Sequence, residues 1–158
     1  MLKIMGAVIL FLASVMIGAQ KYSELCERRH LLSGAMSGIK SIEGRIKCCY
    51  APLDECFRQA GGIFYEASQY MDKGVTPGEA VLEASKKRAL TERDREAFAL
   101  FANGLNAADR EGQLSNAHLF EAQLVSRIAE AEEDIKTKGS LALKGSMLIG
   151  GAALILLI

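Results

Sequence analysis

An uncharged apolar segment stands at each end of the chain, and these two segments limit the possible folds more than any other feature. Residues 4–19 supply about 16 residues, or about 24 Å of helix, slightly short of a hydrocarbon core unless a snorkelling Lys3 extends them. Residues 145–158 reach about 18 residues when the preceding turn and a snorkelling Lys144 are included, which is enough for one span. The sequence therefore predicts an N-terminal transmembrane helix at 1–20, a helical domain at 21–139 and a C-terminal transmembrane helix at 140–158.

A cleaved secretory signal peptide is the alternative for the first segment, because a lysine, an apolar run and a small-residue site at 17–19 follow one another there. Ile17 fits the cleavage pattern loosely, so we expect an uncleaved anchor. Cations favour the cytoplasmic side of a membrane, and most cations near the two segments lie on the domain side. This predicts a cell-membrane protein with two spans, both termini outside and a domain in the cytoplasm. These cations are Lys21, Arg28, Arg29, Lys136, Lys138 and Lys144.

The composition predicts one all-α domain. The 158 residues leave about 120 between the two segments, enough for a single core. Two prolines, no tryptophan and many strong helix formers favour helices, and a net charge of zero gives no indication of a nucleic-acid partner. The four cysteines include an adjacent pair at 48–49 and lack zinc-ligand spacing. In a cytoplasmic domain we expect them to be reduced thiols.

Apolar residues at helical spacing predict a long helix over 22–49, which ends before Pro52. Its glycines at 34, 38 and 44 either allow another helix to approach closely or are tolerated surface residues. Short helices are predicted at 53–59 and 63–72. The inner face of the long helix is assigned to Leu25, Leu32, Ile39, Ile42 and Ile46, and that of the second short helix to Phe64, Ala67, Tyr70 and Met71.

Three further helices have start signals. Thr76 and Glu79 form a capping box before a helix that ends at 86–88, and a second signal stands at 91–94. After a turn at 106–108, Asp109 is the predicted N-cap of a final long helix. We expect this helix to run antiparallel to the first long helix, in a membrane-anchored bundle or hairpin. The inner faces are assigned to Ala80, Val81 and Ala84; to Ala97, Leu100, Phe101 and Leu105; and to Leu114, His118 or Leu119, Leu124, Ile128, Ala131 and Ile135.

No catalytic motif is found, so the sequence predicts a protein that is not an enzyme and has no cofactor. Cys26 and His30 could form half of a metal site, but no second pair completes it. His118 has Ser115 rather than a glutamate three residues earlier, so we interpret it as a core-edge or surface residue and predict no metal site. A polar cluster marks the last helix start, and it either caps the helix or docks a cytoplasmic partner. It contains Asp109, Arg110, Glu111 and Gln113.

Several of these segments together resemble one family. They are the Met-Leu-Lys start, a Pro-Leu-Asp-Glu element at 52–55, Leu105 followed by Asp-Arg-Glu-Gly-Gln at 109–113, and a glycine-rich apolar end at 145–158. Over essentially its whole length the chain resembles the stage III sporulation protein AB family, and its architecture is similar to the helical domain of type II secretion system protein F. Arg45, Cys48 and Ala51 stand where we expect Glu, Tyr and Thr in the family, which indicates a divergent member with an altered surface at Arg45.

The resemblance implies a non-enzymatic membrane platform component of the mother-cell to forespore channel. It implies as partners a secretion-type ATPase of the same apparatus, of the stage III sporulation protein AA type, and the other stage III channel proteins. Carried over by position, Asp109, Arg110 and Gln113 are the residues that matter, with Glu111 in the same patch. The alternatives are a platform subunit of another secretion or pilus system, and a thiol- or metal-binding membrane sensor. The oligomeric state stays open.

Overall fold

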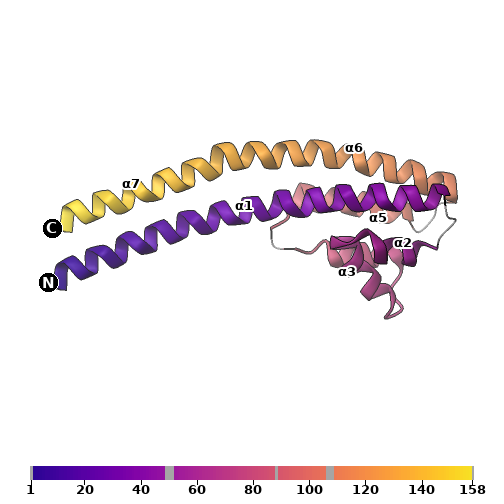
Figure 1. Cartoon of the computed structure of the whole chain (residues 1–158), viewed down its shortest axis with the longest axis horizontal. Helices are drawn as coiled ribbons and strands as arrows, with labels where there is room; N and C mark the ends of the chain where they lie inside the picture. The colour runs from indigo at the N-terminus through magenta and orange to yellow at the C-terminus, as the bar shows by residue number, and fades with distance from the viewer. Residues whose placement is uncertain (1, 49–51, 88, 106–108, 158) are drawn as a thin grey trace. The chain divides into compact units, whose positions relative to one another are not determined.

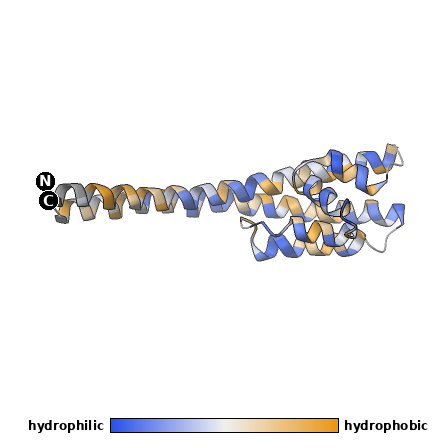
Figure 2. Ribbon diagram, turned by 90° about the horizontal axis from the view of Figure 1, so that it is seen from below, coloured by the Kyte–Doolittle hydropathy of each residue, from blue (hydrophilic) through white to orange (hydrophobic). Residues whose placement is uncertain are grey.

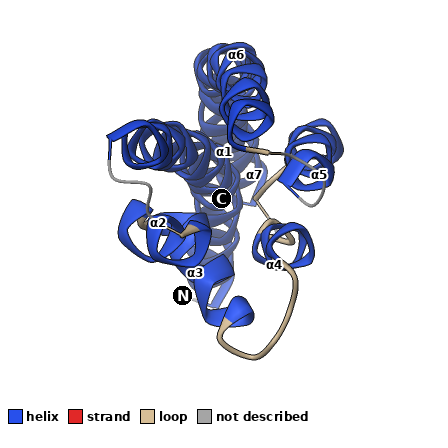
Figure 3. Cartoon of the chain, turned by 90° about the vertical axis from the view of Figure 1, so that its right-hand side faces the viewer, coloured by secondary structure: helices blue, strands red, loops and turns tan. Residues whose placement is uncertain are grey.

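The computed structural model describes residues 2–48, 52–87, 89–105 and 109–157, and within these ranges every regular element is a helix (Figures 1 and 3). The all-α prediction is confirmed. Predictions that concern Cys49, Ala51, Arg88 and the turn at 106–108 fall outside the described residues. The elements in order are α1 (Leu2–Cys48), α2 (Leu53–Ala60), α3 (Gly62–Met71), α4 (Pro77–Ala84), α5 (Glu92–Leu105), α6 (Arg110–Asp134), the π-helix η1 (Ile135–Gly139) and α7 (Ser140–Leu157).

The chain forms two compact units, which we treat separately. Residues 28–129 make up the helical body. Residues 1–27 together with 130–158 make up the terminal unit. Both units contain part of α1 and part of α6, because each of these helices crosses the boundary between the units. The predicted domain boundaries at 20 and 139 stay a prediction.

A chain of five buried phenylalanines forms the core of the helical body. Neighbouring ring centroids lie between 4.5 and 5.9 Å apart, within the range at which aromatic pairs attract one another. The chain passes through α2, α3, α5 and α6, so one aromatic cluster joins four helices. In order of contact the five are Phe57, Phe64, Phe101, Phe120 and Phe98.

Helix α1 presents a buried stripe to this core. Leu32, Ile39, Ile42 and Ile46 are all buried, as their spacing predicts, whereas Leu25 is only half-buried. Of the glycines in this stretch, Gly38 is the one that permits a close approach. A Cβ there would come within 2.6 Å of the Phe64 ring, whereas a Cβ at Gly34 or Gly44 would meet nothing. Both interpretations of these glycines are therefore correct on the same helix: Gly38 allows a close approach, and Gly34 and Gly44 are tolerated at open positions.

The start signals of α4 and α5 act as predicted. The Thr76 hydroxyl accepts a hydrogen bond from the Glu79 backbone N–H and donates one to the Glu79 carboxylate. The inner face of α4 is also as predicted, since Ala80, Val81 and Ala84 are buried.

Two inner-face predictions are wrong, and both concern leucines. Leu100 on α5 is 60% exposed, and Phe98 is buried in its place. On α6, Leu119 is 64% exposed and His118 is exposed as well, while Ala117 and Phe120 turn inward. In each helix a larger phenylalanine packs into the aromatic cluster, and the helix is rotated so that the leucine faces solvent. Leu124 and Ala131 are buried as predicted, and Leu114, Ile128 and Ile135 are half-buried.

The terminal unit is held together by small residues. The Ser14 hydroxyl donates a hydrogen bond of 2.8 Å to the Ser146 carbonyl oxygen. Gly18 faces Ser146 and Ala142, and Gly150 faces Phe11 and Ser14, so closely that a Cβ on either glycine would overlap its neighbours. These contacts run antiparallel along α1 and α7, and Gly139 against Tyr22 continues them. Large apolar side chains such as Met16 and Leu148 are exposed. Figure 2 shows that hydrophobic residues gather along the helices near both chain ends.

One helix among the described residues is long and apolar enough to cross a membrane by length and composition. It lies near the N-terminus within Val8–Cys48, and 6% of its most apolar window is buried. This agrees with the predicted first anchor. The second predicted span, at 140–158, stays a prediction.

Candidate functional site

A buried ion pair fixes α5 against α1 in the helical body. Arg28 Nε lies 2.7 Å from Asp94 Oδ2, Arg28 Nη2 lies 3.0 Å from Asp94 Oδ1, and both side chains are almost fully buried. Asp94 Oδ2 also accepts hydrogen bonds from the backbone N–H and the hydroxyl of Thr91. The predicted start signal at 91–94 is therefore confirmed, and its acidic residue has a second role as the partner of a buried arginine.

The electrostatics of this pair favour the charged form of Asp94. Burial by itself raises the pKa of the Asp94 carboxyl, but hydrogen bonds from Arg28 and Thr91, together with the Arg28 charge, outweigh it and hold this pKa below its usual value. Arg28 was one of the cations from which the membrane orientation is predicted. Because it is buried beside a carboxylate, it contributes less to that argument than exposed Lys21 and Lys138.

The residues predicted to bind a partner stand at the start of α6. Asp109 is the N-cap: its Oδ1 accepts a hydrogen bond of 2.9 Å from the backbone N–H of Gly112. Arg110 reaches the other long helix, where Nε donates to the Ile46 carbonyl oxygen at 3.1 Å and Nη2 to that of Lys47 at 2.8 Å. One guanidinium thus satisfies two of the carbonyl groups that the C-terminus of α1 leaves without helical partners.

The remaining two members of the predicted patch have different exposures. Glu111 is exposed and Gln113 is half-buried. The structure therefore gives Asp109 and Arg110 structural roles within the chain, and leaves the Glu111 carboxylate at the surface of the same helical turn.

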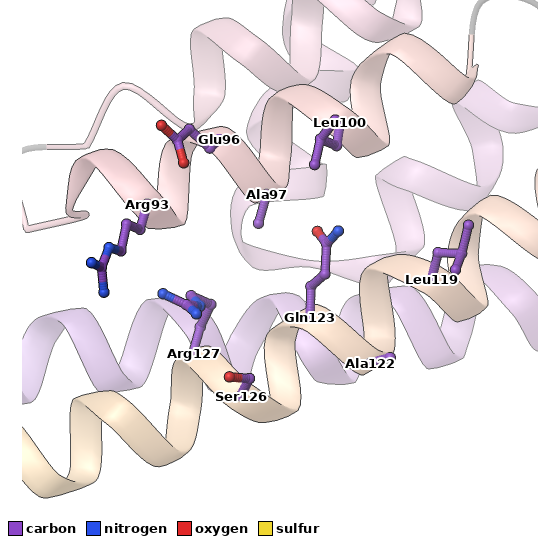
Figure 4. A pocket seen from close by; sticks show the side chains of 9 residues that line it. All are labelled: Arg93, Glu96, Ala97, Leu100, Leu119, Ala122, Gln123, Ser126 and Arg127. Carbon is purple, nitrogen blue, oxygen red and sulfur yellow. The ribbon is translucent and has the colours of Figure 1, made fainter.

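A groove of about 560 Å³ runs between α5 and α6, and the sequence did not predict it. Figure 4 shows its side chains. Arg93 from α5 and Arg127 from α6 extend toward each other at one end, Gln123 projects between the two helices, and the exposed Leu100 and Leu119 lie toward the other end. Two cationic side chains and an apolar section thus line the groove.

The Gln123 side chain adds a polar group to this groove. Its Oε1 is buried and, among the residues that the structure describes, accepts no hydrogen bond. A buried oxygen without a donor is unfavourable by about 1–3 kcal/mol, so a donor from a bound partner would relieve it. The sequence signal for the groove was the pair of candidate inward residues, His118 and Leu119, on α6. One or the other was assigned to the inner face, but both face outward, which agrees with the interpretation of His118 as a surface residue.

The potential metal ligands also differ from those considered in the sequence. The described residues contain one cluster of three such side chains, formed by Glu43, His118 and Glu121, and it includes neither Cys26 nor His30. The described cysteines, Cys26, Cys48 and Cys56, form no disulfide with one another. Glu121 follows His118 by three residues, a spacing visible in the sequence, whereas Glu43 comes from α1 and could be found only through the fold.

Comparison with known proteins gives two findings. A family model described as stage III sporulation protein AB matches residues 3–158. Stage III sporulation protein AB of Bacillus subtilis (strain 168) is 25% identical to this chain over 171 residues, which cover 100% of the chain and 99% of the relative. No solved structure matches.

Proposed function

The chain belongs to the stage III sporulation protein AB family, and from this premise we propose that it is a membrane-anchored platform of the sporulation apparatus that docks a secretion-type ATPase. Family membership supports a role in the sporulation apparatus, and the family's description names a stage of sporulation and no reaction. The observation that carries the docking role is the groove between α5 and α6. It combines exposed leucines, two arginines and a buried amide oxygen that has no hydrogen-bond donor.

The anchoring part of the proposal rests on the terminal unit. Toward the chain ends many exposed side chains are large and apolar, among them Met16 and Leu148, which are more than 70% exposed. Small residues face inward, which is typical of helices that pack within lipid. We propose two spans, with α7 as the second, and a helical body on the cytoplasmic side. Protease added to intact protoplasts would then leave the body whole, and cleavage within residues 28–129 would contradict this orientation.

The chemistry of the groove defines the segment that it would bind. Leu100 and Leu119 suit apolar side chains, while Arg93 and Arg127 suit a carboxylate. An amphipathic segment of the ATPase, with apolar residues along one face and an acidic residue near one end, fits this combination. Glu111 and Gln113, at the start of α6, would be a second contact. Asp109 and Arg110 would support that contact through the helix ends that they cap.

The experiment compares exposed apolar residues inside and outside the groove. A tagged protein is expressed in sporulating cells, membranes are cross-linked, and copurifying proteins are identified. We expect Leu100→Glu with Leu119→Glu to reduce recovery of the ATPase at least tenfold. Val125→Glu is the matched control, because Val125 is a similarly exposed apolar residue of α6 that does not line the groove.

Circular dichroism of the purified variants establishes that both remain folded. Equal recovery of the ATPase with the groove variant and the control would contradict the docking site. If no ATPase is recovered with the unmodified protein, the platform function itself fails. Glu111→Lys tests the second contact separately, because this exposed side chain can be reversed in charge without removing a helix cap.

A further inference from the structure

Three side chains with metal-binding atoms converge between the two long helices of the helical body. Glu43 comes from α1, and His118 and Glu121 come from adjacent turns of α6. His118 Nδ1 lies 3.0 Å from Glu43 Oε1 and 4.0 Å from Glu121 Oε2. One ligand atom of each residue lies within 4.8 Å of the other two. The three atoms are thus close enough to share one central ion.

The Glu43 carboxylate gives an independent indication that an ion belongs there. Glu43 is only 8% exposed, and its Oε1 is buried without a hydrogen bond from any described residue. The imidazole nitrogen Nδ1 of His118 lies 3.0 Å from this oxygen, but the contact is not a hydrogen bond. A buried carboxylate oxygen needs a hydrogen-bond donor or a cation, and the described residues give this one no hydrogen bond, so a cation bound in the cluster would satisfy it.

The spacing of the donor atoms agrees with coordination to one metal. Two ligands at about 2.0–2.2 Å from the same ion, at angles between 90° and tetrahedral, lie about 3.0–3.5 Å from each other. Such ligands point at the ion and not at one another, which explains how Nδ1 and Oε1 can be 3.0 Å apart without a hydrogen bond. The 4.0 Å separation from Glu121 Oε2 needs only a small side-chain rotation, because Glu121 is partly exposed.

We propose that Glu43, His118 and Glu121 bind a divalent first-row transition cation of the Zn²⁺ class, which joins α1 to α6. An imidazole nitrogen with two carboxylates suits such an ion, whereas Ca²⁺ and Mg²⁺ prefer oxygen ligands alone. Three protein ligands leave a fourth position for water. His118 faces solvent, so the ion exchanges with the surrounding solution and acts as a reversible clip between the helices.

Neighbouring lysines oppose the ion. Lys40 Nζ lies 3.2 Å from Glu121 Oε1, and Lys47 Nζ lies 3.8 Å from Glu43 Oε2. Both ammonium groups neutralise the carboxylates when no ion is bound. Lys40 is 61% exposed and can move into solvent when the cation enters. Removing the Lys40 charge should therefore tighten binding.

The test uses the full chain in detergent micelles, titrated with ZnCl₂ or CoCl₂ by calorimetry and by thermal unfolding. We expect one ion per chain, an increase in unfolding temperature, and at least a tenfold loss of affinity in His118→Ala and in Glu43→Gln. His30→Ala is the matched control, since His30 is the other histidine of the chain and is also exposed. Lys40→Ala should bind the ion several-fold more tightly.

The Co²⁺ spectrum distinguishes this site from the cysteines. A cobalt ion held by nitrogen and oxygen lacks the intense near-ultraviolet band of a thiolate complex. Absence of binding, binding that His118→Ala leaves unchanged, or a thiolate band from the bound ion would each overturn the proposal. Failure of the groove variants to affect ATPase recovery would have no bearing on it, because no ligand of the cluster is altered in those variants.

Discussion

The helical body and the terminal unit distribute large and small side chains in opposite ways. In the body, five phenylalanines and a buried ion pair lie inside, and the exposed residues are mostly polar. In the terminal unit, Gly18, Gly139 and Gly150 are buried, while Ile9 and Leu148 are among the most exposed side chains. Water favours the first distribution and lipid the second, because between helices in lipid the hydrophobic effect provides no driving force. Helix α1 thus contains one segment suited to each of the two solvents.

The largest effect is expected from the buried ion pair of the body. Asp94→Ala leaves the Arg28 charge buried without its partner, so we expect a loss of about 3–5 kcal/mol in the free energy of unfolding. Urea denaturation followed by circular dichroism measures it. Replacing both Arg28 and Asp94 by leucine should cost much less, because no charge then stays buried. If the double variant is as unstable as Asp94→Ala, packing rather than charge is responsible.

The same pair predicts how stability depends on pH. The pKa of Asp94 is lower in the folded protein than in the unfolded chain, where it is about 3.9. Its contribution to stability is therefore complete above that unfolded value and decreases as the pH falls through the folded pKa. A pH series of urea denaturations should show this decrease below about pH 4. The decrease should be smaller in Asp94→Asn.

Glycine substitutions in α1 test how closely the body is packed. Gly38→Ala forces the Phe64 ring to move, at an expected cost of about 1–3 kcal/mol. Gly44→Ala is the matched control: its Cβ would meet nothing, so the higher helix propensity of alanine should stabilise the protein by up to about 1 kcal/mol. Thermal unfolding of both variants should give shifts of opposite sign. Shifts of the same sign would contradict the close approach at Gly38.

Arg110 tests whether the start of α6 has a structural role. Arg110→Ala removes two hydrogen bonds to the C-terminus of α1, and we expect it to cost about 1 kcal/mol. Glu111→Ala, one residue along and exposed, should change stability by less than about 0.5 kcal/mol. Chemical denaturation distinguishes the two. An unchanged stability in Arg110→Ala would assign this residue to partner binding alone.

The smallest effect on the body is expected from the terminal unit. With the native cysteines replaced, cysteines at Ser14 and Gly150 should form a disulfide, because a Cβ at Gly150 would lie 3.4 Å from that of Ser14. Gly18→Leu should reduce the yield of this disulfide, since Gly18 is in contact with Ser146. Gly6→Leu is the control, because a Cβ at Gly6 meets nothing. The stability of the body should be the same in both variants.

The sequence predicted the parts of this fold that depend on local signals. The capping residues at Thr76, Thr91 and Asp109 and the buried stripe of α1 all follow from short-range patterns, and the structure confirms them. Helix phase was less certain wherever two apolar residues were adjacent. Leu100 and Leu119 were assigned inward, but Phe98 and Phe120 are buried instead, because their rings pack together in the aromatic cluster. This packing joins two helices, so it could not be seen in the sequence of either one.

The candidate sites also divide into features that follow from short-range sequence signals and features that depend on tertiary contacts. Asp109 could be identified as a cap because its partner is three residues away. The Arg110 contact with α1 joins residues that are more than sixty positions apart, and the Glu43–His118 contact is of the same kind. The groove depends on the relative rotation of α5 and α6. No spacing within a single helix contains that information.

The π-helix at Ile135–Gly139 has a consequence for insertions and deletions. Ala131 and Gly139 are both buried although they are eight residues apart, and a regular α-helix would turn about 80° too far over that distance. The wider π turn absorbs this excess, so the chain carries one residue more than a regular helix needs. Deleting Thr137 should therefore convert the segment to α-helix and keep Ser146 facing Gly18. A deletion inside α7 would turn every later residue by about 100°. We therefore expect insertions and deletions of single residues among related chains to be concentrated at the π turn, Ile135–Gly139.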